Sequence, residues 1–426
     1  MSWLTAAEAL QVLGVRPQTL YANVSRKKIR AKPDPKDTRR SLYHEVDVQK
    51  LARQHGGRRK ATVVAAGAIE WGDPVLSSAL STVVDGRLYY RGKDAVGLSE
   101  SQTLEDVAAL LWGAPGAIDF TQACRAPSRY LSTVGASTPL QRAFLALGVR
   151  ASTDPSSHGR ALSVLQAEAA GVLVTLAGAM LDAPIGARVS GRHVDRRSGA
   201  GAARVRVGRH RRYVGGLRGP SGEGMGNVPL HVRVAASFGR PYAADLMRRT
   251  LVVMADHELN PSTFAARVAV STGAPLSAGV LSGLATLSGP LHGRAALGVL
   301  ELMASVERLG AERAVHDWLS QGRPIAGFGH PLYPAGDPRA TALLQHLALP
   351  PTYAELSAVA EQVIGERPNI DFALAALTKV ERLPAEAPLI LMALGRCAGW
   401  LAHALEQVTS GHPIRPRARY VGPPIS

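Results

Sequence analysis

The chain has 426 residues, of which 46% are hydrophobic, and a formal net charge of +16. This length allows two or three domains with a sizeable core. The two cysteines, Cys124 and Cys397, are too few for a disulfide framework, which favours a reducing compartment. The chain opens without a basic and apolar leader pattern, and its longest apolar run, residues 169–181, is too short to span a bilayer. We therefore expect a soluble, cytoplasmic protein with no membrane contact.

The positive charge is confined to two segments. Residues 1–60 carry 14 Lys and Arg against 5 Asp and Glu, and residues 183–218 carry 10 Arg against Asp195 alone. Each segment has a net charge of +9, so the rest of the chain is close to neutral at about −2. A basic total would ordinarily indicate nucleic acid as a partner. Here that expectation applies to the two segments and not to the body of the protein.

The first sixty residues predict a small domain of short helices. Thr5 and Glu8 form a capping box ahead of a helix that ends at Gly14, and Pro17 suits the first turn of a second helix. The connection between them has the length of a helix-turn-helix. A turn-rich basic loop over 33–40 and a final helix around 46–51 follow.

This order is similar to the MerR/excisionase type of winged helix-turn-helix, with the basic loop as the wing. That resemblance implies base contacts from the second helix and phosphate contacts from nearby cations. The candidate DNA-binding residues are Gln18, Thr19, Tyr21, Asn23, Arg26, Lys27, Lys28, Arg39 and Arg40. The alternative is a helical appendage for oligomer contact with a solvated basic face.

The remaining chain predicts a mostly α-helical body. Asp85-Gly86 lies between two β-prone runs and indicates a hairpin, and a helix is expected over 103–111. Helical periodicity then continues to the C-terminus, including a helix over 278–287 whose small residues suit a tight dimer core.

Residues 183–225 interrupt this pattern with an Arg- and Gly-rich stretch that has no apolar face. Such composition cannot bury enough surface to offset the cost of ordering. Three interpretations stay open: a disordered insertion, a basic loop for polyanions, or a frame-shifted stretch of coding sequence.

Three loops near the C-terminus each hold a titratable residue among Gly and Pro. They contain His292 in Ser-Gly-Pro-Leu-His-Gly, His330 in Gly-Phe-Gly-His, and Asp371 in Pro-Asn-Ile-Asp-Phe. Two imidazoles and a carboxylate fixed by such residues indicate an acid–base site assembled from distant parts of the chain. No His/Cys cluster has metal-ligand spacing, so no metal is expected.

These three motifs, in this order, resemble the citrate synthase family. The resemblance implies that Asp371 takes a proton from the methyl group of an acyl thioester, that His292 stabilises the enol form, and that His330 polarises the ketone of oxaloacetate. The segment Ala-Asp-His-Glu-Leu-Asn-Pro-Ser-Thr matches another family motif and implies that His257 contacts oxaloacetate. Asn260 and Pro261 are expected to cap and begin the next helix.

A dicarboxylate substrate requires arginines. The resemblance assigns this role to Arg339, expected behind an Asp337 cap, to Arg396 inside an apolar helix, and to Arg415, which in the family reaches the neighbouring subunit's site. The usual Arg and Lys of the coenzyme loops are replaced by Pro331 and Pro334. We interpret Arg294 as a substitute contact for the phosphates of coenzyme A.

The resemblance implies citrate-synthase-type large and small helical domains preceded by the winged helix-turn-helix. The expected bounds are 1–60 for the first, 61–295 with 385–426 for the large domain, and 296–384 for the small domain. The leading hypothesis is a homodimeric enzyme that condenses an acyl-CoA, acetyl-CoA first, with oxaloacetate and holds no permanent cofactor. The alternative is a metabolite-sensing, DNA-binding regulator on the same scaffold.

Overall fold

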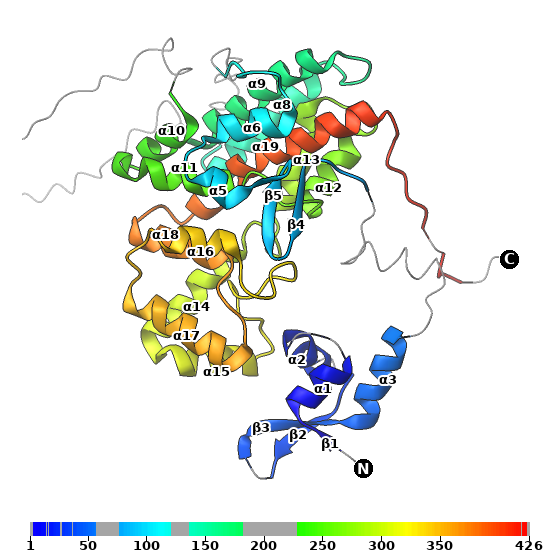
Figure 1. Cartoon of the computed structure of the whole chain (residues 1–426), viewed down its shortest axis with the longest axis vertical. Helices are drawn as coiled ribbons and strands as arrows, with labels where there is room; N and C mark the ends of the chain where they lie inside the picture. Colours follow the sequence, from blue (N-terminus) through cyan, green and yellow to red (C-terminus); the bar gives the residue numbers. More distant parts are fainter. Residues whose placement is uncertain are drawn as a thin grey trace, which may run out of the picture.

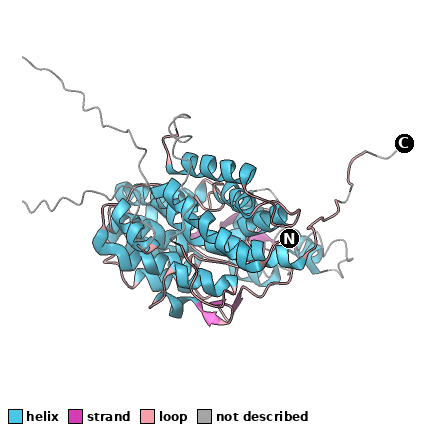
Figure 2. Ribbon diagram, turned by 90° about the horizontal axis from the view of Figure 1, so that it is seen from above, coloured by secondary structure: helices cyan, strands magenta, loops and turns pink. Residues whose placement is uncertain are grey.

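The computed structural model describes residues 3–13, 15, 17–25, 28–35, 37–56, 76–120, 136–181, 228–418 and 420–423. The Arg- and Gly-rich stretch expected over 183–225 lies outside these residues, as do Cys124, Arg26 and Lys27. Within them the protein is mostly helical, as Figures 1 and 2 show, and the few strands are short. The expected mostly α fold is confirmed.

The N-terminal unit combines three helices with a small sheet. Its elements are β1 (Trp3–Leu4), α1 (Ala6–Leu13), α2 (Pro17–Ser25), β2 (Ala31–Asp34), β3 (Asp37–His44) and α3 (Glu45–Gly56). The capping box is present, since the Glu8 carboxylate accepts from the Thr5 backbone and hydroxyl at 2.8 Å. A core separate from the main one forms around Leu20, Ile29 and Tyr43.

The expectation of a loop over 33–40 was incomplete. Most of this segment belongs to the antiparallel pair β2–β3, in a sheet of order β1-β3-β2. Tyr43 on β3 is buried and belongs to the N-terminal core. Tertiary packing here overrides the low strand propensity of Pro, Lys and Asp.

The predicted hairpin opens the body of the protein. Strands β4 (Ser81–Val84) and β5 (Arg87–Tyr90) pair in register, and β6 (Lys93–Asp94) adds to them. Asp85 and Gly86 have φ values of 50° and 71°, which is the left-handed backbone that a two-residue turn of this kind requires. The helices α5 (Ala95–Ser99) and α6 (Leu104–Trp112) follow, and Thr103 with Asp106 forms a second capping box.

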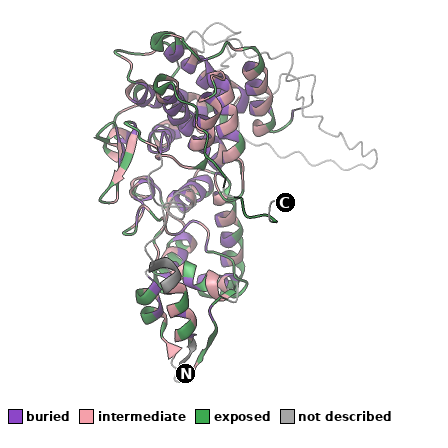
Figure 3. Ribbon diagram, turned by 90° about the vertical axis from the view of Figure 1, so that its right-hand side faces the viewer, coloured by how far each residue is buried: buried purple, intermediate pink, exposed green. Residues whose placement is uncertain are grey.

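The largest group of helices surrounds α19 (Ala387–Ser410), which crosses the upper part of Figure 1. This helix contacts α6, α9, α11, α12 and α13. Figure 3 shows that the buried residues concentrate on the inward faces of these helices. The members not yet given are α8 (Pro139–Thr153), α9 (Leu162–Leu181), α10 (Leu230–Ser237), a 3₁₀ turn (Pro241–Ala243), α11 (Ala244–Val253), α12 (Pro261–Val270) and α13 (Leu276–Leu287).

Two of these helices, α9 and α19, are long and apolar enough to cross a membrane by length and composition. Their most apolar windows are 67% and 94% buried inside the protein. They are therefore core helices of a packed bundle. For example, a side chain at Gly283 of α13 would lie within 3 Å of the Trp400 ring of α19, so this glycine permits the close approach.

A second group of helices lies below the first in Figure 1. It consists of α14 (Ala295–Leu309), α15 (Ala311–Ser320), α16 (Pro338–Leu344), α17 (Pro351–Ile364) and α18 (Ile370–Val380). The chain then returns to the upper group through α19. The domain bounds inferred from the sequence stay a prediction, but this arrangement brings the loops before α16 and α18 toward the loops before α12 and α14.

Candidate active site

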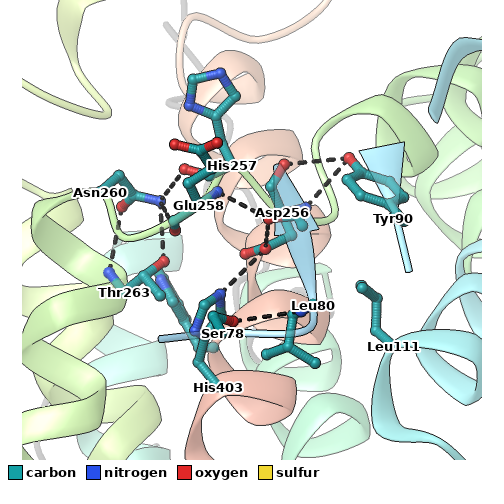
Figure 4. A network of polar contacts seen from close by, with 12 residues as sticks. Ser78, Leu80, Tyr90, Leu111, Asp256, His257, Glu258, Asn260, Thr263 and His403 are labelled. Atoms are coloured by element: carbon teal, nitrogen blue, oxygen red, sulfur yellow. Dashed lines mark hydrogen bonds and ion pairs between the residues drawn. The ribbon is translucent and has the colours of Figure 1, made fainter. Parts of the chain in front are cut away.

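The loop between α11 and α12 is held by a buried polar network (Figure 4). The Asp256 carboxylate accepts hydrogen bonds from the Ser81 hydroxyl and from Nε2 of His403, the latter at 3.1 Å. Burial alone would raise the pKa of Asp256, but His403, Arg396 and the Ser81 hydrogen bond lower it below its ordinary value. Glu258 adopts the left-handed region with φ of 51°, stabilised by a hydrogen bond from its N–H to Ser81.

This strained loop presents the ring of His257, which points away from the network in Figure 4. Its Nε2 lies 2.9 Å from the Tyr333 hydroxyl, and its ring meets that of His330 edge to face at 5.0 Å. Burial lowers the pKa of His257 well below its usual value, and the positive charge of Arg339 adds to the effect. The imidazole is therefore neutral.

His292 is held by the beginning of α12. Its Nε2 lies 2.9 Å from the Ser262 hydroxyl, which also accepts from the Trp400 indole N–H at 3.1 Å. Ser262 donates to Oδ1 of Asn260, the N-cap that already accepts from two backbone N–H groups. The Ser262 hydroxyl has one hydrogen: when it donates to Asn260, the His292 proton is on Nε2, and when it donates to Nε2, that proton is on Nδ1. Burial, then Arg396, lowers the pKa of His292 to about 4.

The His330 loop depends on two glycines. Gly327 and Gly329 have φ values of 84° and 69°, and the Cβ of a larger residue at 327 would lie 2.6 Å from Val299. The backbone N–H of Leu332 donates to Nδ1 of His330 at 3.1 Å. Because that nitrogen accepts, the ring proton is on Nε2, which is the donor that polarising a carbonyl requires.

Arg339 is tied to the loop that carries Asp371. Its guanidinium bonds the Asp337 carboxylate through Nε at 3.0 Å and Nη2 at 2.8 Å, in full burial. Asp337 caps α16 as predicted and also accepts from the N–H of Ile370 at 3.1 Å. Burial alone would lower the pKa of Arg339, but Asp337 raises it above its ordinary value. The cation is thus permanent and fixed in position.

Asp371 lies in the first turn of α18, behind the N-cap Asn369. The Asn369 amide also donates to the Gly329 carbonyl at 3.0 Å and so joins this loop to the His330 loop. The Oδ1 atom of Asp371 is buried without a hydrogen-bond partner among the described residues. Burial raises the pKa of this carboxyl to about 7, although Arg339 and Arg396 oppose the rise. Such a group is a competent base near neutral pH.

Arg396 is the second buried arginine of the site. It is 3% exposed on α19 and its Nε donates to the Met254 carbonyl at 3.1 Å. No carboxylate of the described residues forms a salt bridge with it. Its positive charge lowers the pKa of His257, His292 and Asp371 alike. Burial lowers its own pKa, as expected for a cation that lacks a direct partner.

A cavity of about 170 Å³ opens beside this cluster. Its wall includes His330, Tyr333, Asn369 and, from the N-terminal unit, Pro17. A larger cavity of about 270 Å³ lies between α6, α9 and α10 and is lined by none of the predicted site residues. We assign the site to the smaller cavity because His330 and Tyr333 line it and both rings contact that of His257.

The structure thus brings together six of the predicted residues and leaves others outside. The gathered ones are His257, His292, His330, Arg339, Asp371 and Arg396. Arg294 is exposed at the N-cap position of α14, and Arg415 is exposed on the C-terminal tail, so their roles stay predictions. Among the described residues, no group of three or more His, Cys, Asp or Glu could hold a metal ion.

The predicted DNA-binding residues are described in part. On α2, Thr19 and Tyr21 are exposed, whereas Gln18 and Asn23 are half-buried. The Asn23 amide donates back to the Thr19 carbonyl at 2.8 Å, which occupies one of its donors within the helix. Lys28 is exposed, and Arg39 and Arg40 belong to β3.

Sequence reasoning missed three side chains of the site: Ser262, Tyr333 and Trp400. Each contacts a histidine or the serine that holds one. Ser262 directly follows Asn260 and Pro261, and Tyr333 lies three residues after His330. Both residues therefore lie within motifs that are recognisable in the sequence. Trp400 lies in an apolar helix, and no motif around it indicated a contact with the site.

Comparisons with known proteins agree with this geometry. Residues 229–417 match the family model described as citrate synthase, C-terminal domain. Citrate synthase 2 of Bacillus subtilis is 36% identical over 194 residues, which is 43% of this chain and 52% of that protein. Citrate synthase of Haloferax volcanii is 39% identical over 191 residues, covering 42% of this chain and 50% of the relative. The chain therefore matches about half the length of these relatives.

Solved structures extend the likeness to most of the chain. Citrate synthase of Thermotoga maritima superimposes with a TM-score of 0.61 at 24% identity, over 83% of this chain and 94% of the other. A second match is the ternary complex of carboxymethyl coenzyme A and oxaloacetate with the Thermoplasma acidophilum citrate synthase. It superimposes with a TM-score of 0.61 at 20% identity, over 83% of this chain and 95% of the other.

The fold is helical, and it holds buried histidines, arginines and a carboxyl between two groups of helices. That fold is the citrate synthase fold, and residues 229–417 match the model of the citrate synthase C-terminal domain.

Proposed function

We propose that the protein is a citrate-synthase-type enzyme that condenses an acyl-CoA with oxaloacetate to give citrate and coenzyme A. The observation that carries the proposal is the convergence of a carboxyl with a pKa of about 7, two neutral imidazoles and two buried arginines. The match of residues 229–417 to the citrate synthase C-terminal domain supports it. So does the likeness to a structure solved with a coenzyme A analogue and oxaloacetate.

In the proposed reaction Asp371 removes a proton from the methyl group next to the thioester. A free carboxylate could not do this usefully, so the developing enolate oxygen needs a hydrogen bond at the same time. His292 faces that oxygen with Nδ1. Donation requires the ring proton on Nδ1, which Ser262 permits when its hydroxyl turns from Asn260 to Nε2.

The enol carbon then forms a bond to the ketone carbon of oxaloacetate. The Nε2–H of His330 donates to the ketone oxygen as it becomes an alkoxide, and the arginines hold the carboxylates. Water finally cleaves the thioester, and coenzyme A leaves as a free thiol. Burial of the site keeps water from protonating the enol before the carbon–carbon bond has formed.

Thiol release tests the proposal directly. We expect free thiol from acetyl-CoA or propionyl-CoA only when oxaloacetate is present, with acetyl-CoA preferred. A folded protein that releases no thiol from either acyl-CoA would overturn the enzyme and favour the alternative of a sensor on this scaffold.

The pKa of Asp371 predicts the pH dependence of this reaction. The base must be deprotonated, so kcat/KM should rise about tenfold per pH unit below pH 7 and level off above it. His292, with a pKa of about 4, stays neutral across this range and adds no second inflection. Initial rates from pH 5 to pH 9 check this, and a profile that is flat across pH 7 would exclude Asp371 as the titrating base.

The same proposal includes a cytoplasmic homodimer in which Arg415 completes the partner's site and Arg294 contacts the acyl-CoA. Within one chain, Gly279 and Gly283 of α13 pack against Val270 and Trp400, so they are not evidence for the dimer. Light scattering coupled to gel filtration measures the dimer, and an Arg294→Ala variant with unchanged acyl-CoA KM would remove that contact from the proposal.

We further propose that residues 3–56 form a winged helix-turn-helix that binds DNA. The short connection from α1 to α2 and the basic β2–β3 pair support it, with exposed Thr19, Tyr21 and Lys28 available for contact. Because phosphate contacts release counterions, binding should weaken steeply as salt rises.

Selection of the full-length protein on a randomised 30-base-pair duplex library tests this proposal. We expect enrichment of a sequence, and a Lys28→Ala variant should lower the slope of log K against log salt by about one. No enrichment together with salt-independent binding would leave the N-terminal unit as a contact appendage.

A further inference from the structure

A cluster of three rings lies between the two groups of helices. The Tyr333 ring is 5.6 Å from that of His257 and 4.9 Å from that of His330, measured between centroids. Tyr333 is only 2% exposed. Its hydroxyl therefore cannot rely on water and must be satisfied by the protein or by a ligand.

The orientation of Tyr333 is fixed from several sides. Its backbone N–H donates to the His330 carbonyl at 2.9 Å, which closes a turn, and its own carbonyl accepts from Gly336 at 3.0 Å. The Arg339 guanidinium lies 5.2 Å from the centre of its ring. A side chain fixed in this way can impose an orientation on the group that its hydroxyl contacts.

That group is His257, whose Nε2 lies 2.9 Å from the Tyr333 hydroxyl. Across the described part of the chain, the His257 ring makes no other hydrogen bond, so Nδ1 remains for a ligand. A neutral imidazole carries one N–H, and its position decides whether the other nitrogen donates or accepts. The partner of Nε2 thus controls the chemistry at Nδ1.

We propose that Tyr333 is a positioning residue: its hydroxyl donates to Nε2 of His257 and holds the imidazole proton on Nδ1. His257 then offers a neutral N–H donor to a carboxylate oxygen of the keto acid. The identity of that ligand rests on the proposed function, whereas the tautomer itself does not.

The charges around the ring favour this tautomer. Arg339 and Arg396 both act on His257, so the space beside it suits an anion, and a lone pair on Nδ1 would repel that anion. The phenol keeps its proton, because burial raises the pKa of Tyr333 to about 12. Because this phenol is a neutral hydrogen-bond donor, it adds no third positive charge next to Arg339 and Arg396.

Tyr333→Phe tests the proposal, with Tyr353→Phe as a matched control. Tyr353 is also buried among the lower helices, but among the described residues its hydroxyl reaches only the Ala375 carbonyl, at 3.5 Å. We expect Tyr333→Phe to raise the KM for oxaloacetate roughly tenfold with a smaller change in kcat, the size of one buried hydrogen bond. Tyr353→Phe should leave both constants unchanged.

Nitrogen-15 spectra of histidine-labelled protein report the tautomer of His257. If the role of Tyr333 were merely structural, Tyr333→Phe would not change these spectra. The His257 signals, assigned with a His257→Gln sample, should show the Nδ1–H tautomer in the unsubstituted protein and a mixture in Tyr333→Phe. An Nε2–H tautomer in the unsubstituted protein, or spectra and KM unaffected by Tyr333→Phe, would overturn the proposal.

The outcomes of the Tyr333→Phe test can be distinguished from a failure of the proposed function. If the unsubstituted protein releases no thiol from acyl-CoA, the enzyme proposal fails. The tautomer spectra, together with oxaloacetate affinity by calorimetry, still decide the role of Tyr333.

Discussion

Replacing Asp371 by asparagine should lower kcat by about 10³-fold to 10⁴-fold, near the upper end of what a general base contributes. The amide has the same shape but cannot take the methyl proton. Oxaloacetate affinity should change little, because in the proposed function Arg339 and Arg396 bind the carboxylates of that substrate. Thiol release and calorimetric binding measure the two effects separately.

The same variant should be more stable than the unsubstituted protein at alkaline pH. The folded carboxyl has a pKa of about 7, above its ordinary 3.8, so the folded state keeps a proton that the unfolded state loses. Below pH 4 both states are protonated and there is no penalty. The penalty grows from pH 4 to pH 7 and is complete above it, on the order of 2 to 4 kcal/mol.

Denaturant titrations at pH 4.5 and pH 8.5 check this sign. Asp371→Asn should gain stability only at the higher pH, whereas Asp317→Asn, at an exposed position on α15, should show no such gain. Equal stability of Asp371→Asn and the unsubstituted protein at pH 8.5 would mean that the carboxyl is not desolvated, and retained catalysis would remove it as the base.

Replacing Arg396 by glutamine should raise the KM for oxaloacetate by roughly 30-fold to 1000-fold while leaving the protein at least as stable. Losing one partner of a buried charge pair costs about 2 to 5 kcal/mol of binding. In the unliganded chain, however, the guanidinium is buried against the Met254 carbonyl without a salt bridge among the described residues. Removing such a charge relieves a desolvation cost.

Arg248 is the matched control, because it is also a buried arginine but has a structural role. Its guanidinium donates to the carbonyls of Ser99, Glu100 and Gln102 and to Asp245. Arg248→Gln should therefore lower the melting temperature and leave the KM of the folded enzyme unchanged. If Arg396→Gln instead unfolds the protein and binds oxaloacetate normally, Arg396 is structural too.

The parts of the site that could be predicted from the sequence are those fixed by residues close together in the chain. The caps formed by Asn260 and Asp337 could be predicted from their neighbours, because a cap is defined within four residues. The loops of His292 and His330 were marked by Gly and Pro. The hairpin at Asp85-Gly86 was predicted for the same reason.

The contacts that escaped prediction join residues far apart in the chain. Tyr333 and His257 are separated by 76 positions, and Trp400 and Ser262 by 138. No period or cap encodes such a pairing, since it depends on how the helices pack. The β2–β3 pair was missed because Pro33, Asp34 and Asp37 indicate turns, whereas in the fold these residues lie in paired strands.

The hydrogen bonds of Asp337 and Asn369 have a mechanical consequence. They fasten the turns bearing His330, Arg339 and Asp371 into one rigid piece, while His257, His292 and Arg396 belong to the opposite group of helices. If the two groups of helices hinge apart, Arg339 and Asp371 move together. The proposed anion-binding arginine and the proton acceptor therefore reach a bound substrate at the same time. The contact between Tyr333 and His257 spans the seam, so it forms and breaks with that single motion.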